Sequence, residues 1–289
     1  MRAWLRNPWG RPRFLPIVTG LYILWSIVPV AVAVLFAFND GRSRTTWQGF
    51  STRWFNEDPG SVRNDPGLLS ALEHTLLLAA LCVAFAVPLG VALALGLQRW
   101  RGFGSGPVNT LMLLPLVTPE LVMGVALLLL FLQIFNGWGL GTWAQAIGQV
   151  TFAVSYVVVI VRGRLVSIGR EYEEAAADLG APPVSRLTRV LLPMLAPAIL
   201  ASAGVVFALS IDDFVITQYL AAGADTNTVS MLLYSTARGA PSPALNALAS
   251  ITLVITLATI ALAYLVYRRF AGAGSASEVA TLGEVAVER

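Results

Sequence analysis

Long apolar runs separated by short polar segments dominate the chain. Six runs come close to the roughly 20 apolar residues that a helix needs to cross about 30 Å of hydrocarbon. Backbone amides find no water partners in hydrocarbon, so each run is expected to be a helix and not an open strand. The pattern therefore predicts an all-α polytopic membrane protein with six transmembrane helices. Their approximate limits are Phe14–Phe38, Ser70–Leu97, Asn109–Leu132, Trp143–Val161, Met194–Phe214 and Leu245–Tyr267.

The composition excludes a water-soluble globule. Of 289 residues, 56% are hydrophobic and only 12% are charged, whereas a soluble domain carries roughly 25% charged residues. A soluble chain of this size has too little polar surface to cover so many apolar side chains. The mean hydropathy of +0.72 agrees with a membrane protein.

The polar residues exclude several kinds of site. All 19 basic residues are arginine, so the chain has no lysine for a Walker A nucleotide loop or a Schiff base. One cysteine, Cys82, and one histidine, His74, supply neither a disulfide nor a His/Cys metal site. The sequence therefore predicts no catalytic residue, cofactor or metal in this chain. The net charge of +3 does not indicate nucleic-acid binding, because the arginines lie at the edges of the apolar runs.

The distribution of arginine predicts the orientation in the membrane. With the N-terminus in the cytoplasm, 14 arginines fall in inner segments and five in outer ones. This asymmetry favours both termini inside. Four of the five outer arginines fall in the first outer loop, which weakens the pattern at that loop. The outer arginines are Arg42, Arg44, Arg53, Arg63 and Arg238.

A polar segment between the fourth and fifth runs, residues 171–183, predicts a short amphipathic helix outside the membrane. Glutamates crowd its first turn, where the helix dipole favours negative charge. Tyr172, Ala175, Ala176 and Leu179 recur at helical spacing and form one low-profile apolar face. Gly180 suits the position that stops a helix, and two prolines follow it. From the pattern alone, this helix is either a docking element or a solvated connector that packs on the protein's own inner face.

The spacing within this segment resembles the EAA signature of ATP-binding-cassette importer permeases. Glu174-Ala175-Ala176, then Gly180 after three residues, then Val190-Leu191-Leu192-Pro193 after nine more reproduce its pattern. Only Val190, which replaces isoleucine, departs from it. The resemblance implies a coupling helix that docks on a separate cytoplasmic ATPase. Glu174 would then make polar contact, Ala175 and Ala176 close packing, and Gly180 the turn.

The resemblance also implies a domain organisation and a set of partners. Residues 1–13 are expected to form a cytoplasmic N-terminal segment, and 14–270 a six-helix permease domain with its core at about 70–267. Residues 271–289 are small and polar and are expected to form a disordered cytoplasmic tail. The implied partners are a second homologous permease subunit, two ATPase subunits and an extracytoplasmic substrate-binding protein. The implied location is a bacterial inner membrane.

Other stretches resemble the second membrane subunit of spermidine/putrescine transporters. The resemblance covers nearly the whole chain apart from its N-terminal residues and tail, although related permeases share much of this skeleton. It implies that the substrate is a polyamine. The matching stretches are Phe38-Asn39-Asp40 with Trp47-Gln48-Gly49-Phe50, Pro119-Glu120, Ser210-Ile211-Asp212-Asp213, and the segment from Ser242 to Ala249.

Three acidic residues and one tyrosine are candidates for a substrate pathway. A carboxylate at mid-membrane costs roughly 2.5–3.5 kcal/mol on insertion scales, so it usually faces a bundle interior or a watery path. Glu120 is predicted half-way through the third span, and Asp212 and Asp213 near the outer end of the fifth. Carboxylates there would offset the dehydration of an ammonium group, and Tyr219 would contribute cation–π attraction. The alternatives are a hydrogen bond to a neighbouring helix for Glu120, helix capping for the aspartates and interfacial anchoring for Tyr219.

Three other functions remain open. The first is transport of a different solute within the same family, such as an iron(III) chelate, an organic anion or an aminophosphonate. An ion-gradient-driven secondary transporter, in which Glu120 binds protons, is a second class. A membrane scaffold or assembly subunit without a transport path is a third. The EAA spacing disfavours the last two.

Overall fold

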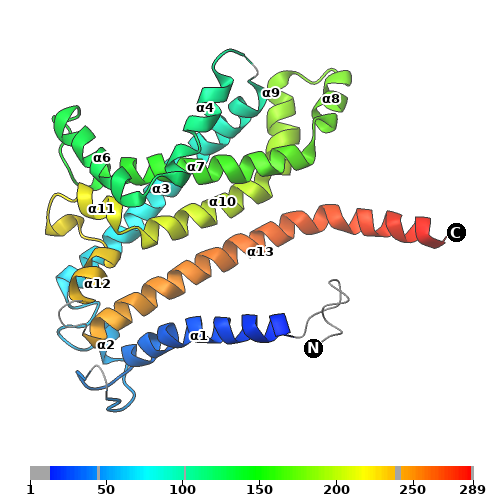
Figure 1. Ribbon diagram of the computed structural model, residues 1–289. Helices are drawn as coiled ribbons and strands as arrows, with labels where there is room; N and C mark the ends of the chain where they lie inside the picture. Colours follow the sequence, from blue (N-terminus) through cyan, green and yellow to red (C-terminus); the bar gives the residue numbers. More distant parts are fainter. Residues whose placement is uncertain (1–13, 44–45, 101, 238–241, 288–289) are drawn as a thin grey trace, which may run out of the picture.

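The computed structural model describes residues 14–43, 46–100, 102–237 and 242–287, and in these ranges the protein is all-α (Figure 1). A single isolated bridge pairs Asn39 with Phe50 there. Five described segments are long and apolar enough to cross a membrane: α1 (Phe14–Ala37), α3 (Pro66–Arg99), α7 (Thr142–Ile168), Pro183–Asp212 and Pro243–Val266. The last of these belongs to a longer helix, α13 (Pro243–Val287).

The predicted third span, over 109–132, is a bent pair of segments and not one straight helix, and with it the described residues hold up to six candidate spans. Its apolar run forms α4 (Ser105–Leu111), α5 (Leu114–Val117) and α6 (Glu120–Gln133), and the two halves are bent by 110° at the break. Proline lacks an N–H and disfavours helical geometry in the residue before it. Thr118 accordingly adopts an extended backbone with ψ 130°, and α6 begins directly after Pro119.

Short helices connect or extend the long ones. The fifth predicted span is α10 (Leu192–Asp212), which continues a turn of π-helix, η1 (Arg186–Leu191), and α9 (Pro183–Ser185). A second interruption follows Asp212, because α11 (Val215–Leu220) starts as a new helix. The remaining helices are α2 (Arg53–Asn56), α8 (Glu171–Asp178), η2 (Ala224–Thr226) and α12 (Val229–Ala237).

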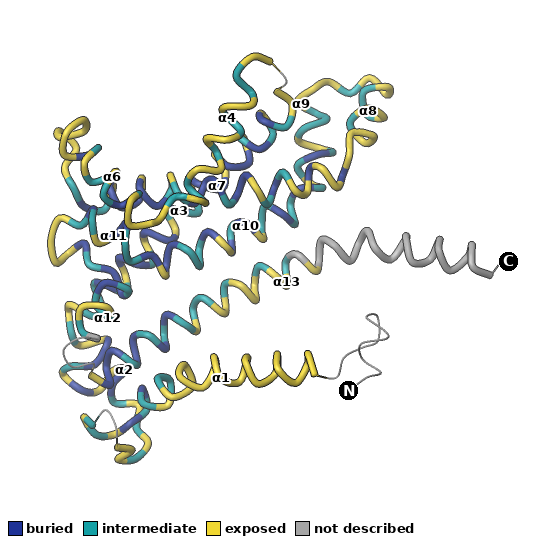
Figure 2. Tube along the Cα trace, in the orientation of Figure 1, coloured by how far each residue is buried: buried dark blue, intermediate teal, exposed yellow. Residues whose placement is uncertain are grey.

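The core lies between α3, α7 and α10. Close packing of α3 on α7 depends on Gly90, because a Cβ there would lie 2.5 Å from the Cβ of Val157. Buried residues in Figure 2 concentrate on these helices, whereas α1 is exposed along most of its length and runs beside α13. Trp25 of α1 is 78% exposed. Apolar side chains that the protein leaves uncovered are expected to face lipid or another membrane helix.

The two ends of the bundle differ in what they carry. The start of α1, the far end of α13 and α8 lie toward the same end, on the right in Figure 1. The loop that contains α2 and the helix α12 lie toward the opposite end. Helix α13 continues to Val287, where the sequence predicts a disordered tail. Residues 288–289 lie outside the described part.

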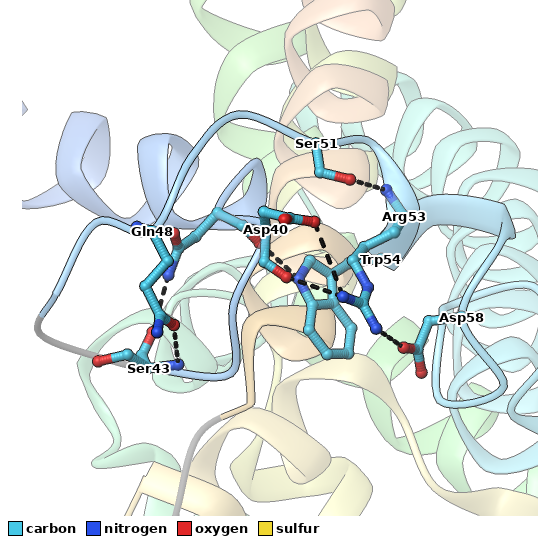
Figure 3. Close-up of polar contacts among 8 residues, drawn as sticks. Asp40, Ser43, Gln48, Ser51, Arg53, Trp54 and Asp58 are labelled. Carbon is cyan, nitrogen blue, oxygen red and sulfur yellow. Dashed lines mark hydrogen bonds and ion pairs between the residues drawn. The ribbon is translucent and has the colours of Figure 1, made fainter.

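The first outer loop is a folded unit, shown in Figure 3. Asn39 is fully buried, and its side chain binds the backbone of Ser43, Thr46 and Gln48. The Trp54 indole donates a hydrogen bond to the Asn39 carbonyl at 2.6 Å. Arg53 pairs with Asp58 across 2.5 Å and lies 3.7 Å from Asp40. Two carboxylates of this loop thus neutralise the charge of Arg53.

Candidate functional site: a coupling helix and a carboxylate-lined cavity

Helix α8 forms where the sequence predicts it and ends as predicted. Glu171, Glu173 and Glu174 occupy its first turn. The Gly180 N–H donates to the carbonyl of Ala177, and the Ala181 N–H donates to that of Ala176. This pair of bonds is a Schellman motif, which needs a left-handed residue, and Gly180 has φ +79°. Glycine therefore supplies a turn that other residues adopt only with strain.

The predicted docking residues are open to a partner. Glu174, Ala175 and Gly180 are exposed, and Ala176 is half-buried. On the predicted apolar face, Tyr172 is 54% and Leu179 is 89% exposed. Helix α8 contacts η1 beneath it. The arrangement leaves Tyr172 and Leu179 uncovered on one side of α8, and Glu174 exposed on another.

The three predicted pathway carboxylates meet at one cavity of about 250 Å³. It lies where the break before α6 meets the interruption between α10 and α11. Helix α7 contributes Gln149, Phe152 and Tyr156, and α3 contributes Cys82. Interrupted helices at membrane depth are tolerated where they are enclosed by protein or line a watery space. The geometry therefore brings Glu120, Asp212 and Asp213 together.

Asp213 is buried and its oxygens are already bonded. They accept hydrogen bonds from the Ile216 and Thr217 N–H groups at 3.2 and 3.1 Å, and from the Gln149 amide at 3.1 Å. The first N–H groups of a helix have no partner within it, so Asp213 caps α11. This is the capping role left open from the sequence.

Glu120 and Asp212 are more available to a ligand. Glu120 is exposed and is the first residue of α6, where the helix dipole favours a negative charge. It lines the same cavity as Asp213. Asp212, the last residue of α10, is also exposed. Glu120 thus lies in the middle of the third span, at the break from which α6 begins.

Tyr219 lies elsewhere, at the contact between α6 and α11. A Cβ on Gly124 would approach the Tyr219 ring at 2.8 Å, so the ring packs directly on this glycine. Tyr219 is not among the residues that line the carboxylate cavity. Its observed contact is helix packing.

Two glutamines on α7 bind the interrupted segment, a role that was not predicted from the sequence. Gln145 is fully buried, donates to the carbonyls of Thr217 and Thr226, and contacts His74 Nε2 at 2.8 Å. Gln149, one turn later, receives a hydrogen bond from the Ser210 hydroxyl at 2.6 Å. The signal in the sequence that could have identified them is a pair of amide side chains, four residues apart, inside an apolar run.

Comparison with known families identifies the class of protein. Residues 86–272 match the family described as binding-protein-dependent transport system inner membrane component. The match covers more than half of the chain, and the chain therefore belongs to this family of transport permeases. It is a multi-pass component of the inner membrane.

Individual relatives are similar along most of their length. The putrescine transport system permease protein PotI of Escherichia coli is 35% identical over 254 residues, covering 86% of this chain and 87% of that protein. The spermidine/putrescine transport system permease protein PotC of the same organism is 32% identical over 251 residues, covering 87% and 92%. Both are named as permease proteins of transport systems.

Solved structures share the fold. A bacterial alginate ABC transporter in complex with an alginate pentasaccharide-bound periplasmic protein has a chain that matches with a TM-score of 0.70. The match has 18% sequence identity and covers 93% of this chain and 98% of that chain. The fold of this protein is therefore that of an ABC-importer membrane subunit.

Proposed function

We propose that this permease forms half of the membrane pathway of an ATP-driven polyamine importer. The observation that carries the substrate class is the carboxylate-lined cavity, in a chain whose relatives PotI and PotC are named for putrescine and spermidine. An ammonium group that leaves water needs ion pairs and charge-assisted hydrogen bonds. Glu120 and Asp212 supply the carboxylates that are available to a ligand. Asp213 stabilises the interrupted segment between α10 and α11, which forms one wall of the cavity. Tyr219, through its packing on α6, supports the same wall.

Helix α8 is the docking element for a separate ATPase. Its exposed Glu174, the small side chains of Ala175 and Ala176, and the tight turn at Gly180 form a surface that another protein can approach closely. Closure of two ATPase subunits on nucleotide moves α8, and the attached helices α7 and α10 move with it. A ligand shifts such an equilibrium only by its differential affinity for the two states.

The remaining partners follow from the permease class. The pathway is completed by a second, homologous membrane subunit, and substrate arrives from an extracytoplasmic binding protein. Both termini lie in the cytoplasm with α8. This agrees with the start of α1, the far end of α13 and α8 lying toward one end of the bundle (Figure 1) and with the excess of arginine in the inner segments.

The substrate class is tested by charge changes in the cavity. Glu120→Gln removes one charge-assisted hydrogen bond of about 1.5–3 kcal/mol, which corresponds to an uptake loss of about ten- to one-hundred-fold. Asp212→Asn is expected to act in the same direction. Uptake of labelled putrescine and spermidine is measured in proteoliposomes with the complete transporter. The control is Glu57→Gln, which neutralises an exposed carboxylate in the outer loop.

Three results would contradict the proposal. Unchanged polyamine uptake in Glu120→Arg would exclude a cation route past this residue. Stimulated uptake of an organic anion by the same variant would indicate the opposite substrate charge. Uptake without ATP would indicate an ion-gradient-driven transporter.

The docking proposal has its own test. Glu174→Arg reverses the charge beside the docking surface and is expected to abolish import while the protein remains in the membrane at its normal level. Immunoblots of membrane fractions control for the amount of protein. Wild-type uptake in this variant would count against docking on α8.

A further inference from the structure

Helix α8 is attached to the rest of the chain by few contacts. It has only eight residues and, within the described structure, none of them is buried. An isolated helix of this length is marginal in water, so its orientation depends on tertiary contacts. Gly169 before it and Gly180 after it have φ of +72° and +79°, so both connections leave the helix through glycine turns.

One contact links α8 to a membrane helix that is distant in the sequence. Arg99, the last residue of α3, forms an ion pair with Glu173 in the first turn of α8. The two side chains are 51% and 21% exposed. Together with Leu95, Leu165 and other residues they line a cavity of about 180 Å³ between α8 and the inner ends of α3 and α7. Because this space is not filled by apolar packing, the polar pair is the direct link across it.

The neighbouring glutamates are placed differently. Glu171 and Glu174 are exposed, whereas Glu173 is half-buried and turned toward α3. The first turn of α8 thus separates an outward carboxylate, at Glu174, from an inward one, at Glu173. The EAA signature includes Glu174 and contains neither Glu173 nor Arg99.

Helix α3 is well placed to carry a displacement into the bundle. It packs on α7 and α10 more extensively than the other described helices pack on one another. Its buried residues Ala86, Val91 and Ala94 belong to the same apolar cluster as Val157 of α7. A helix packed so closely moves with its neighbours, because packed interiors transmit strain.

We infer that Arg99 and Glu173 are positioning residues that couple α8 to α3 and so carry the movement of the docked ATPase into the bundle. The inference rests on the proposed docking of an ATPase on α8. Covalent connections already join α8 to α7 and, through η1, to α10. The ion pair adds α3, so that all three core helices follow the coupling helix together.

The test uses the complete transporter, purified with its ATPase and membrane partner and reconstituted with its binding protein. Arg99→Glu and Glu173→Arg each replace attraction with repulsion, and the double variant restores an ion pair in reversed order. The measured quantities are ATP hydrolysed per polyamine imported and the stimulation of ATP hydrolysis by the binding protein. Each single variant is expected to lower stimulation and raise the ATP cost per substrate by about two- to five-fold, the range of an exposed ion pair. The double variant is expected to recover most of both.

A matched control and a docking readout separate the two proposals. Arg268→Glu makes the same charge change just beyond the membrane part of α13, Pro243–Val266, and is expected to leave coupling unchanged. Cross-linking of α8 to the ATPase is measured in every variant, and its yield is expected to stay at the wild-type level. Wild-type coupling in the single variants, or a double variant no better than the worse single one, would overturn the role of the pair. If α8 of the wild-type protein formed no cross-link to the ATPase, this result would instead overturn the docking proposal itself.

Discussion

At the scale of single residues, two carboxylates on the same cavity differ in what their oxygen atoms already bind. Asp213 accepts three hydrogen bonds from buried donors, whereas Glu120 is exposed at the start of α6. Leaving a buried donor unsatisfied costs about 1–3 kcal/mol. Asp213→Ala is therefore expected to destabilise the protein by at least this amount, and Glu120→Ala to change stability by less than about 0.5 kcal/mol.

Thermal unfolding in detergent measures this difference, and it is monitored as the fraction of the protein that remains monodisperse. Uptake is recorded in parallel. Glu120→Ala is expected to retain its melting temperature and to lose uptake. Equal melting temperatures for the two variants would mean that Asp213 does not cap α11.

The outer loop contains a carboxyl whose protonation is linked to folding. Hydrogen bonds from the Gly60 N–H and from Arg53 hold the pKa of Asp58 below its usual value of 3.8. A group with a lowered pKa in the folded state stabilises the fold above its ordinary pKa and loses this contribution as the pH falls through the folded value. The stability difference between wild type and Asp58→Asn is therefore expected to be constant from about pH 8 to pH 5 and to shrink below about pH 4. Unfolding midpoints measured across this range test it, and a difference that grows on acidification would contradict it.

At the scale of elements, packing of the interrupted helix α11 on α7 depends on one glycine. A Cβ on Gly148 would lie 2.7 Å from both Ile216 and Leu220, whereas a Cβ on Gly163 of the same helix meets nothing within 4 Å. Overpacking a filled core typically costs about 1–3 kcal/mol, and alanine is the better helix former by up to about 1 kcal/mol. Gly148→Ala is expected to lower the melting temperature of the purified protein, and Gly163→Ala to leave it unchanged or raise it. The reverse order would show that α11 is not seated on α7 as described.

The sequence predicted the long elements well and the interruptions poorly. The length of an apolar run determines whether it can cross a membrane, and this length located α1, α3, α7, α10 and the membrane part of α13. The break at Pro119 was missed because a proline inside an apolar run is compatible with either a kink or a new helix, and the neighbours decide between them. The start of α11 was missed for a related reason. Its first N–H groups donate to the Asp213 carboxylate, and Gln145 and Gln149 of α7 donate to the Thr217 carbonyl and to that carboxylate. A pattern along one segment does not record bonds from another helix.

At the scale of the whole molecule, the site residues fall into two groups. The sequence predicted the local structure of the first group, but for the second it predicted only which residues belong to it. The EAA spacing located α8, and a local signal of this kind suffices because caps and turns are formed within the segment. The acidic residues were identified because a carboxylate inside a membrane is energetically unfavourable. Their separate roles were not predicted, because capping by Asp213 and access at Glu120 arise only when α6, α7, α10 and α11 meet. The pair formed by Arg99 and Glu173 joins positions 74 residues apart, and nothing in either segment alone indicates it.

The central claim is that work done by another polypeptide enters this permease through α8. The most direct measurement is site-specific cross-linking from Glu174→Cys, in a Cys82→Ala background, in native membranes, followed by identification of the linked chain. The account predicts a cross-link to a nucleotide-hydrolysing subunit whose yield changes when nucleotide and the loaded binding protein are added together. A cysteine at this position that is labelled from the outer face, or that links to no ATPase, would contradict the account.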